Sequence, residues 1–550
     1  MRFQSSLSAL TLAVAVEAAA VEPRATTTTT STSSTTTGPN WFQTTPELYA
    51  GTTETGSAPF LAETNPVTFT GVSYTPNYPL QTSEPIQGAN GQNIFHWMGN
   101  LSPYYPSVDG FGVEEYPLPS GTNITQMHLL QRHGSRYPSS SEGLATWGEK
   151  IMNLTAKGTK FTDNLAFLND WSYGLGLEIL VARGRQELFD SGILNWYNYG
   201  KLYNSSSSHK LVARTTTEDR MLKSAENFLA GFFGLDWTEY ANLLPIIEEV
   251  GYNNSLIGMY ACDKALEWEE SSLMMEPIEE WMETYLKDIT ATLKKQAGGY
   301  DWTVADSYDA QALCAYETVS FGYSPFCELF DFAHWKDYSY LIDIEFAVMS
   351  GFASPAGRAQ GIAWVEEFLA RVQGHLLTVT DTDANMTLDT NEVTFPTDQT
   401  LYFDFAHDAS IVSTLTAFGF EQFAGSLPVT GPPADQEFFT SKIVPFAGRI
   451  NIEIIRAPHK VPAKRPTGSQ AEAYVAGTSE TYYVHFLLNQ RTLPLHSSFT
   501  GCEYRDDGWC ELDTFLAIQK DSLAQSQFDY ACNGNYTFTS YGTVTNGVPA

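Results

Sequence analysis

Residues 131–138 of this chain read QRHGSRYP, and this stretch decides most of what the sequence predicts. It follows a mainly apolar run, Met127–Leu130, which has the character of a buried strand. Two arginines, Arg132 and Arg136, flank His133 within one turn. Guanidinium groups form charge-assisted hydrogen bonds with phosphate oxygens, and an imidazole can attack as a nucleophile or carry a proton. The stretch therefore predicts a phosphate held against a reactive nitrogen.

The rest of the chain is strongly acidic. It has 63 Asp and Glu residues against 30 Lys and Arg, for a formal net charge of −33. Binding to a phosphate backbone needs a basic surface, so we expect no nucleic acid partner. Such a charge suits an acidic medium, in which protonation of carboxylates reduces self-repulsion. The 550 residues allow two domains or one large α/β domain with insertions.

Several features predict export. Residues 1–20 have the pattern of a signal peptide, and no later apolar run is long enough to span a bilayer. The six cysteines are even in number and form no zinc-like cluster, which favours structural disulfides. We expect an extracellular protein, secreted or associated with the cell wall, that carries N- and O-linked glycans and binds no membrane. The N-glycosylation sequons lie at Asn100, Asn123, Asn153, Asn204, Asn253, Asn385 and Asn535.

The composition changes along the chain. Residues 21–39 are dominated by Thr and Ser and predict a flexible, O-glycosylated leader. The following segment, up to residue 121, is rich in Pro, Gly, Thr and Tyr and is expected to wrap a core formed downstream. Residues 40–216 and 336–550 are assigned to a discontinuous α/β domain, and 217–335 to a mainly helical domain.

Three predicted strands are each followed by polar residues. The strand at 124–130 precedes Arg132, His133 and Arg136; the strand at 211–213 precedes Arg214; and the strand at 401–405 precedes His407 and Asp408. Ligands of open α/β sheets bind beyond the carboxyl ends of the strands, so these groups converge if the strands are neighbours. One histidine would then attack phosphorus, and Asp408, if protonated, would donate to the leaving oxygen.

The sequence also predicts the helices and strands around these motifs. Helices are expected at 142–151 and 409–418, with two further strands at 450–455 and 482–488. A helix capped by Thr216 or Thr217 is expected to end at Gly234. Another is expected to begin with Ser354 at the N-cap and Pro355 at the first position, and to end at Gly374.

Each motif also has a purely structural interpretation. An arginine such as Arg214 is commonly a surface or ion-pair residue, and a histidine such as His407 is commonly a hydrogen-bonded core residue. Asp408 stands where a helix begins, which is a position for an ordinary N-cap. The functional interpretation therefore depends on the joint occurrence of the three motifs at predicted strand ends.

The motif Arg132-His133-Gly134-x-Arg136-x-Pro138, together with the distant His407-Asp408, resembles the histidine acid phosphatase family, in particular its secreted fungal phytases and acid phosphatases. The similarity runs from about residue 100 to residue 535. It includes Ser191–Ile193, Val212–Arg214, Gly357–Gly361, Pro494–His496 and the pair Cys502 and Cys510.

The resemblance implies a role for each site residue. His133 would be the nucleophile that forms a phosphohistidine, and Asp408 would protonate the leaving alcohol. The phosphate would be bound by Arg132, Arg136, Arg214 and His407. No metal or other cofactor is implied.

The resemblance also implies a fold. This fold is a large mixed α/β domain with a phosphoglycerate-mutase-like sheet, and a smaller, mainly helical domain is inserted over the active site. The implied disulfides are Cys262–Cys532, Cys314–Cys327 and Cys502–Cys510.

The substrate is predicted from charge. Fungal phytases often carry lysine where Asn169 stands, and tend to have lysines near Asp343–Glu345, where this chain is acidic. Each close pair of like charges costs about 1 kcal/mol in water-like surroundings. We therefore expect a broad acid phosphatase acting on small phosphate monoesters, with a dedicated phytase, which hydrolyses myo-inositol hexakisphosphate, as the alternative.

Two other classes of function share features of this sequence. A phosphotransferase of the mutase kind shares the Arg-His-Gly device but acts inside cells, which the signal peptide disfavours. A catalytically weak secreted binding or cell-wall protein on the same fold is disfavoured by the intact His133 and Asp408.

Overall fold

The computed structural model describes residues 93–107, 109–204, 209–465 and 479–550. The expected signal peptide, the Thr/Ser-rich leader and the segment up to residue 92 lie outside the described residues. Within the described residues, no helix is long and apolar enough to cross a membrane.

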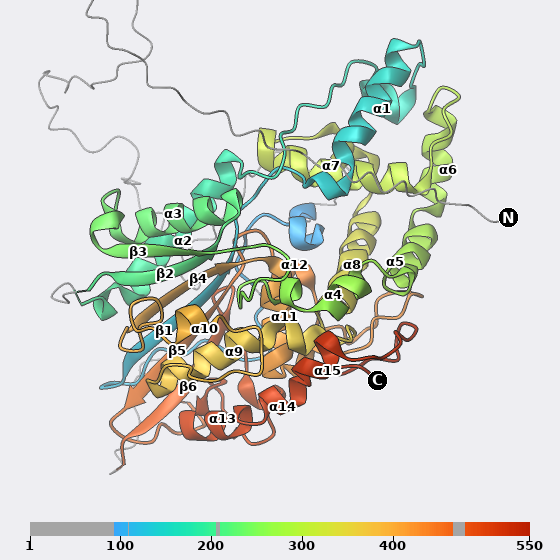
Figure 1. Cartoon of the computed structure of the whole chain (residues 1–550). Helices are drawn as coiled ribbons and strands as arrows, with labels where there is room; N and C mark the ends of the chain where they lie inside the picture. Colours follow the sequence, from blue (N-terminus) through green and yellow to red (C-terminus); the bar gives the residue numbers. More distant parts are fainter. Residues whose placement is uncertain (1–92, 108, 205–208, 466–478) are drawn as a thin grey trace, which may run out of the picture. The chain divides into compact units, whose positions relative to one another are not determined.

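A mixed sheet of eight strands forms the centre of the described chain (Figure 1). The strand order is β3-β2-β4-β1-β5-β6-β7, and β8 pairs with β6. The first four strands in this order are parallel, and β5 to β8 are antiparallel. The strands are β1 Asn123–Arg132, β2 Leu211–Thr216, β3 Ala241–Ile246, β4 Leu401–Ala406, β5 Arg449–Ala457, β6 Thr481–Leu488, β7 Arg491–Thr492 and β8 Cys510–Glu511.

Helices cover both faces of the sheet (Figure 1). On one face, α2 (Ala182–Tyr199) and α3 (Asp219–Phe233) pack on alternate strand residues that include Leu129 and Phe403. On the other face, α9 (Gly357–Gln373) and α11 (Asp408–Phe418) pack on residues that include Leu130. Every residue of β4 is buried, as expected for a central parallel strand. The expected mixed α/β fold is thereby confirmed.

A group of helices lies beyond the carboxyl ends of the parallel strands (Figure 1). It includes α1 Leu144–Ala156, α4 Asp263–Glu269, α5 Ser272–Tyr285, α6 Lys287–Gln296, α7 Val304–Phe321 and α8 Phe332–Met349. The remaining helices are α10 Met386–Asp389, α12 Thr440–Ile443, α13 Leu512–Gln519, α14 Ser522–Ser526 and α15 Phe528–Asn533. Because α3 and β3 pack with the sheet, the helical region begins after residue 246 rather than at 217; the rest of the domain division stays a prediction.

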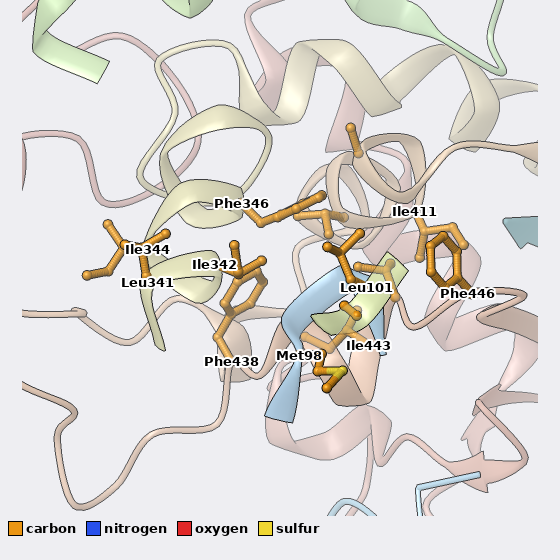
Figure 2. Packing of buried hydrophobic residues seen from close by; sticks show 14 of the residues in the cluster. Met98, Leu101, Leu341, Ile342, Ile344, Phe346, Ile411, Phe438, Ile443 and Phe446 are labelled. Atoms are coloured by element: carbon orange, nitrogen blue, oxygen red, sulfur yellow. The ribbon is translucent and has the colours of Figure 1, made fainter. Parts of the chain in front are cut away.

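The segment that precedes β1 is anchored in the core. It forms two short 3-10 helices, η1 (Ile94–Trp97) and η2 (Gly99–Leu101). Met98 and Leu101 pack among buried residues of α8, α11 and α12, including Ile342, Ile411 and Ile443 (Figure 2). This part of the expected wrapping segment is therefore built into the hydrophobic core.

Three disulfides join the cysteines, and the pairing is the expected one: Cys262–Cys532, Cys314–Cys327 and Cys502–Cys510. The first links the start of α4 to α15 across 270 residues of sequence. The second joins α7 to the turn that follows it.

Two predicted helix starts are wrong. Thr216 is the last residue of β2, and α3 begins at Asp219 with Glu218 at its N-cap. The α9 helix begins at Gly357, two residues after Pro355, because the Ser354 hydroxyl accepts a hydrogen bond from the Ala356 N–H in a preceding turn. The predicted helix ends at Gly234 and Gly374 are confirmed.

Candidate active site

The two histidine motifs lie side by side because their strands do. β1 and β4 are parallel neighbours in a register that places Arg132 opposite Ala406. His133 and His407 therefore leave the sheet at the same edge, and their ring centroids are 5.8 Å apart. Both rings are buried.

The loop after β1 is held tightly against α2. A Cβ added to Gly134 would lie 2.2 Å from the carbonyl oxygen of Gly184, so no other residue fits there without displacing the helix. The next residue, Ser135, donates its backbone N–H and its hydroxyl to the Glu187 carboxylate. These contacts fix the direction in which the His133 ring points.

The His133 ring is neutral and has one nitrogen free of a proton. Its Nδ1 lies 2.9 Å from the Gly134 carbonyl oxygen, which can only accept, so Nδ1 carries the proton and Nε2 keeps its lone pair. Burial lowers the pKa of His133 well below its usual range, and the charges of Arg132, Arg220 and Arg136 lower it further. A neutral imidazole with a free Nε2 is the form that attacks phosphorus.

Asp408 forms an ion pair with Arg132. Its Oδ2 lies 2.6 Å from Arg132 Nη2 and accepts a hydrogen bond of 3.0 Å from Asn100 Nδ2. Its Oδ1 accepts from the backbone N–H of Ala409 at 2.9 Å. Burial raises the pKa of Asp408, but Arg132 and the Asn100 hydrogen bond outweigh it and lower the pKa to about 2.

The structure corrects the expected role of Arg214. Its Nε and Nη2 donate to Asp404 at 2.7 and 2.8 Å, and Nη2 also donates to Glu367 at 2.6 Å. Arg371 and the Trp364 indole bind the same Asp404. Arg214 is therefore part of a buried ion-pair network inside the sheet, and its assignment to phosphate binding is wrong.

Arg220 occupies the place expected for Arg214. It lies in the first turn of α3, and Ser224, one turn later on the same helix face, accepts a hydrogen bond of 3.2 Å from the Gly134 N–H. Arg220 pairs with Glu178 at 3.0 Å and Glu218 at 2.6 Å. Sequence reasoning missed it, although the rule that ligands bind after strand ends favours a residue beyond Thr216 over one inside β2.

Arg132, Arg136 and Arg220 all act on His133 with their charges, and each has a donor atom that no other protein group uses. Arg136 pairs with Glu142 at 3.1 Å and donates to the Tyr316 hydroxyl at 3.1 Å. The Nε atoms of Arg132, Arg136 and Arg220 are all buried without a hydrogen-bond partner in the structure. Buried polar atoms are rarely left unsatisfied, so these donors indicate a site for an anion.

Carboxylates line the opposite side of His407. Its Nε2 lies 2.9 Å from Glu248 Oε1, and Glu218, Glu248 and His407 bring one ligand atom each within 4.8 Å of one another. These three could hold a cation, although Glu218 already pairs with Arg220. The His407 charge lowers the pKa of Glu248 against the effect of burial.

A further carboxyl faces the site from α8. Burial raises the pKa of Glu345 to about 7, and the charges of Asp408, Glu142 and Glu269 contribute in the same direction. At acidic pH this raised pKa keeps Glu345 neutral, and Asp343 is buried against Gln436 and Thr440, so the negative charge expected at 343–345 develops only as the pH nears neutrality. Asn169 instead donates to the carbonyl oxygens of Phe161 and Ala166 and closes its own turn.

Buried cationic donors, a neutral histidine and a carboxyl group are the groups that hydrolysis of a phosphoric monoester requires. The Histidine phosphatase superfamily (branch 2) profile matches residues 123–489. Phytase A of Aspergillus fumigatus is 30% identical over 441 residues, which cover 76% of this chain and 87% of that protein. The chain belongs to the histidine phosphatase superfamily, branch 2.

Other known proteins agree with this assignment. The acid phosphatase of Schizosaccharomyces pombe is 25% identical over 462 residues, covering 80% of this chain and 90% of that protein. The crystal structure of the phytase from D. castellii superposes with a TM-score of 0.62 at 22% identity and covers 82% of this chain and 89% of that one. This last likeness supports the fold.

Proposed function

We propose that the protein is a secreted acid phosphatase of broad specificity, which hydrolyses phosphate monoesters through a phosphohistidine at His133. The observation that carries this proposal is the neutral His133 ring beside three arginines whose buried Nε donors lack partners. Arg132, Arg136, Arg220 and His407 would hold the phosphoryl oxygens.

The proposed reaction has two displacements. In the first, His133 Nε2 attacks phosphorus, the bond from phosphorus to the ester oxygen breaks, and the Asp408 carboxyl gives its proton to that oxygen. In the second, water attacks the phosphohistidine, the bond from phosphorus to nitrogen breaks, and the Asp408 carboxylate accepts the proton of the water. Phosphate leaves, and His133 and Asp408 return to their starting forms.

Asp408 must gain a proton before the first step. It is ionised beside Arg132, with a pKa of about 2. A bound phosphate dianion competes for Arg132 and adds negative charge beside the carboxylate, and both effects raise the pKa of Asp408. An acidic medium supplies the proton, which agrees with the strongly acidic composition of the chain.

Charge in the lining favours simple esters over phytate. Glu142 and Glu345 face the site, and an ionised carboxylate repels a close substrate phosphate by about 1 kcal/mol in water-like surroundings. Glu345, with a pKa of about 7, adds this repulsion only as the pH nears neutrality. A substrate with one phosphate meets this repulsion least. Phytate hydrolysis is the second candidate function, and the similarity to proteins named Phytase A favours it.

Secretion is part of the proposal. Disulfides persist in oxidising compartments, and all six cysteines are paired in the structure. The sequon asparagines at 123, 153 and 535 are exposed, as N-glycans require.

The decisive experiment traps the intermediate. Wild-type enzyme and His133→Ala are mixed with a radiolabelled phosphate ester and quenched within one turnover in alkali, in which phosphohistidine survives. We expect label on the wild-type peptide that contains His133 and none on the variant. Equal hydrolysis by both proteins would show that another residue is the nucleophile.

A further inference from the structure

Asn100 contacts both members of the Arg132–Asp408 ion pair. Its Nδ2 donates to Asp408 Oδ2 at 3.0 Å, and its backbone carbonyl accepts a short hydrogen bond from Arg132 Nη1. The same Oδ2 receives Arg132 Nη2 at 2.6 Å. Asn100 therefore belongs to a three-residue cluster formed by η2, the end of β1 and the start of α11.

The backbone at Asn100 is fixed by the residues around it. Met98 and Leu101 are buried in the cluster drawn in Figure 2, and Ser102 is 0% exposed. The Ser102 hydroxyl accepts a hydrogen bond of 3.2 Å from the Met98 N–H, which closes the turn. The amide is thus presented to Asp408 from a rigid support.

We propose that Asn100 is a positioning residue for the general acid, and that its sequon stays unglycosylated in the active enzyme. The inference rests on the proposed role of Asp408 as the acid. An amide has both a donor and an acceptor, so Asn100 can donate through Nδ2 to the carboxylate and, after turning, accept through Oδ1 from the carboxylic acid. It can therefore hold Asp408 in one direction through both protonation states of the cycle.

The same geometry predicts that the sequon at Asn100 carries no glycan. Asn100, Leu101 and Ser102 read N-x-S, and a glycan would attach to Nδ2, the atom that donates to Asp408. Exposed sequons such as Asn123 and Asn535 have no such contact with the site. A sugar on Asn100 would separate it from Asp408, so a molecule glycosylated there could not assemble the site.

Glycan mapping tests the inference on the unaltered protein. Secreted, active enzyme is treated with a glycan-releasing amidase, which converts each glycosylated asparagine to aspartate, and its peptides are weighed by mass spectrometry. We expect conversion at exposed sequons such as Asn123 and Asn535, and intact asparagine at position 100. Conversion at Asn100 in the active fraction would overturn the proposal.

Two variants separate the amide from the sequon. Asn100→Ala and Asn100→Gln both abolish the sequon, but only the first removes the amide, and neither touches the Ser102 hydroxyl that closes the turn. We expect Asn100→Ala to lower kcat for alkyl phosphates by about tenfold, and for nitrophenyl phosphate much less, because a good leaving group needs little help from an acid. The pH profile for alkyl esters should also shift. Asn100→Gln, which keeps an amide at this position, should restore the ratio of the two substrates toward the wild-type value.

The outcomes also distinguish this inference from the proposed function. A normal yield of phosphohistidine with no leaving-group effect in Asp408→Asn would remove the acid itself, and the role of Asn100 with it. A clear leaving-group effect in Asp408→Asn, with Asn100→Ala and Asn100→Gln both keeping the wild-type substrate ratio, would reject the positioning role alone. If Asn100→Ala does not fold, the glycan map of the wild-type enzyme still decides the inference.

Discussion

Arg132 Nη2 lies 2.6 Å from Asp408 Oδ2, so the last residue of β1 is ion-paired to the first residue of α11. The same guanidinium keeps a buried Nε without a partner. An anion that binds at this Nε must share Arg132 with Asp408. The arginine therefore links the occupancy of the phosphate site to the charge on the proposed acid.

This link predicts proton uptake on binding. The free enzyme holds Asp408 ionised at any pH above about 2. Sulfate, whose charge is constant near pH 5, should raise the pKa of Asp408, so that binding draws a fraction of a proton from the buffer, and this fraction should grow as the pH is lowered toward about 3. Calorimetry in buffers of different ionisation enthalpy measures this uptake. Asp408→Asn should abolish it, and equal uptake by the two proteins would assign the proton to another group.

Substitution of Arg220 should lower catalysis, whereas substitution of Arg214 should lower stability. Arg220→Ala removes a donor at the phosphate site and should lower kcat/KM by about 100-fold or more, with little change in Tm. Arg214→Met leaves Asp404 and Glu367 buried without their partner and should cost about 3–5 kcal/mol of unfolding free energy. Steady-state kinetics and denaturant unfolding measure the two effects. A loss of activity without a loss of stability in Arg214→Met, and the opposite result in Arg220→Ala, would assign phosphate binding to Arg214 instead.

Glu345 should make substrate preference depend on pH. Its pKa of about 7 means that it is neutral in acid and ionises as the pH rises through neutrality. The ratio of kcat/KM for phytate to that for a simple monoester should therefore fall between about pH 5 and pH 8, because repulsion of the polyanion grows. Glu345→Gln should flatten this change. A ratio with the same pH dependence in both proteins would exclude Glu345 as its cause.

The protein should be more stable to unfolding near pH 4 than near pH 7. Burial raises the pKa of Asp309 to about 7 from 3.8, so the folded state keeps a proton that the unfolded chain releases. Its contribution to the free energy of unfolding therefore decreases as the pH rises from about 4 to about 7 and is constant above that. Tm measured across this range should fall, and Asp309→Asn, with no titrating group, should show a smaller fall. An identical fall in the variant would place the effect elsewhere.

The site residues that directly follow a strand could be predicted from the sequence. His133 and His407 each follow a recognisable apolar strand, so the convergence of their motifs could be anticipated. Arg214 was misassigned because Leu211–Ala213 looks complete, whereas the strand continues to Thr216 and carries Arg214 into the sheet. Strand register and side-chain pairing are set by neighbours distant in sequence, here Asp404 and Glu367.

Other site residues had no local signal. Tyr316 reaches Arg136 from α7, and Asn100 reaches Asp408 from 308 residues away in the chain. Such contacts depend on how α7 and η2 pack over the sheet, which periodicity does not reveal. The overall class of fold was easier to predict, because the alternation of apolar strands and amphipathic helices is a local property.

The bridge between Cys262 and Cys532 has a consequence for biosynthesis. The partners are 270 residues apart, so β4, β5 and β6 must all be translated before the second thiol appears. Cys314 and Cys327 emerge in the meantime and can capture Cys262 in a non-native pair. Thiol exchange then has to undo that pair. Yield of this protein from a secretory host should consequently be limited by disulfide isomerase, and co-expression of that enzyme should raise it.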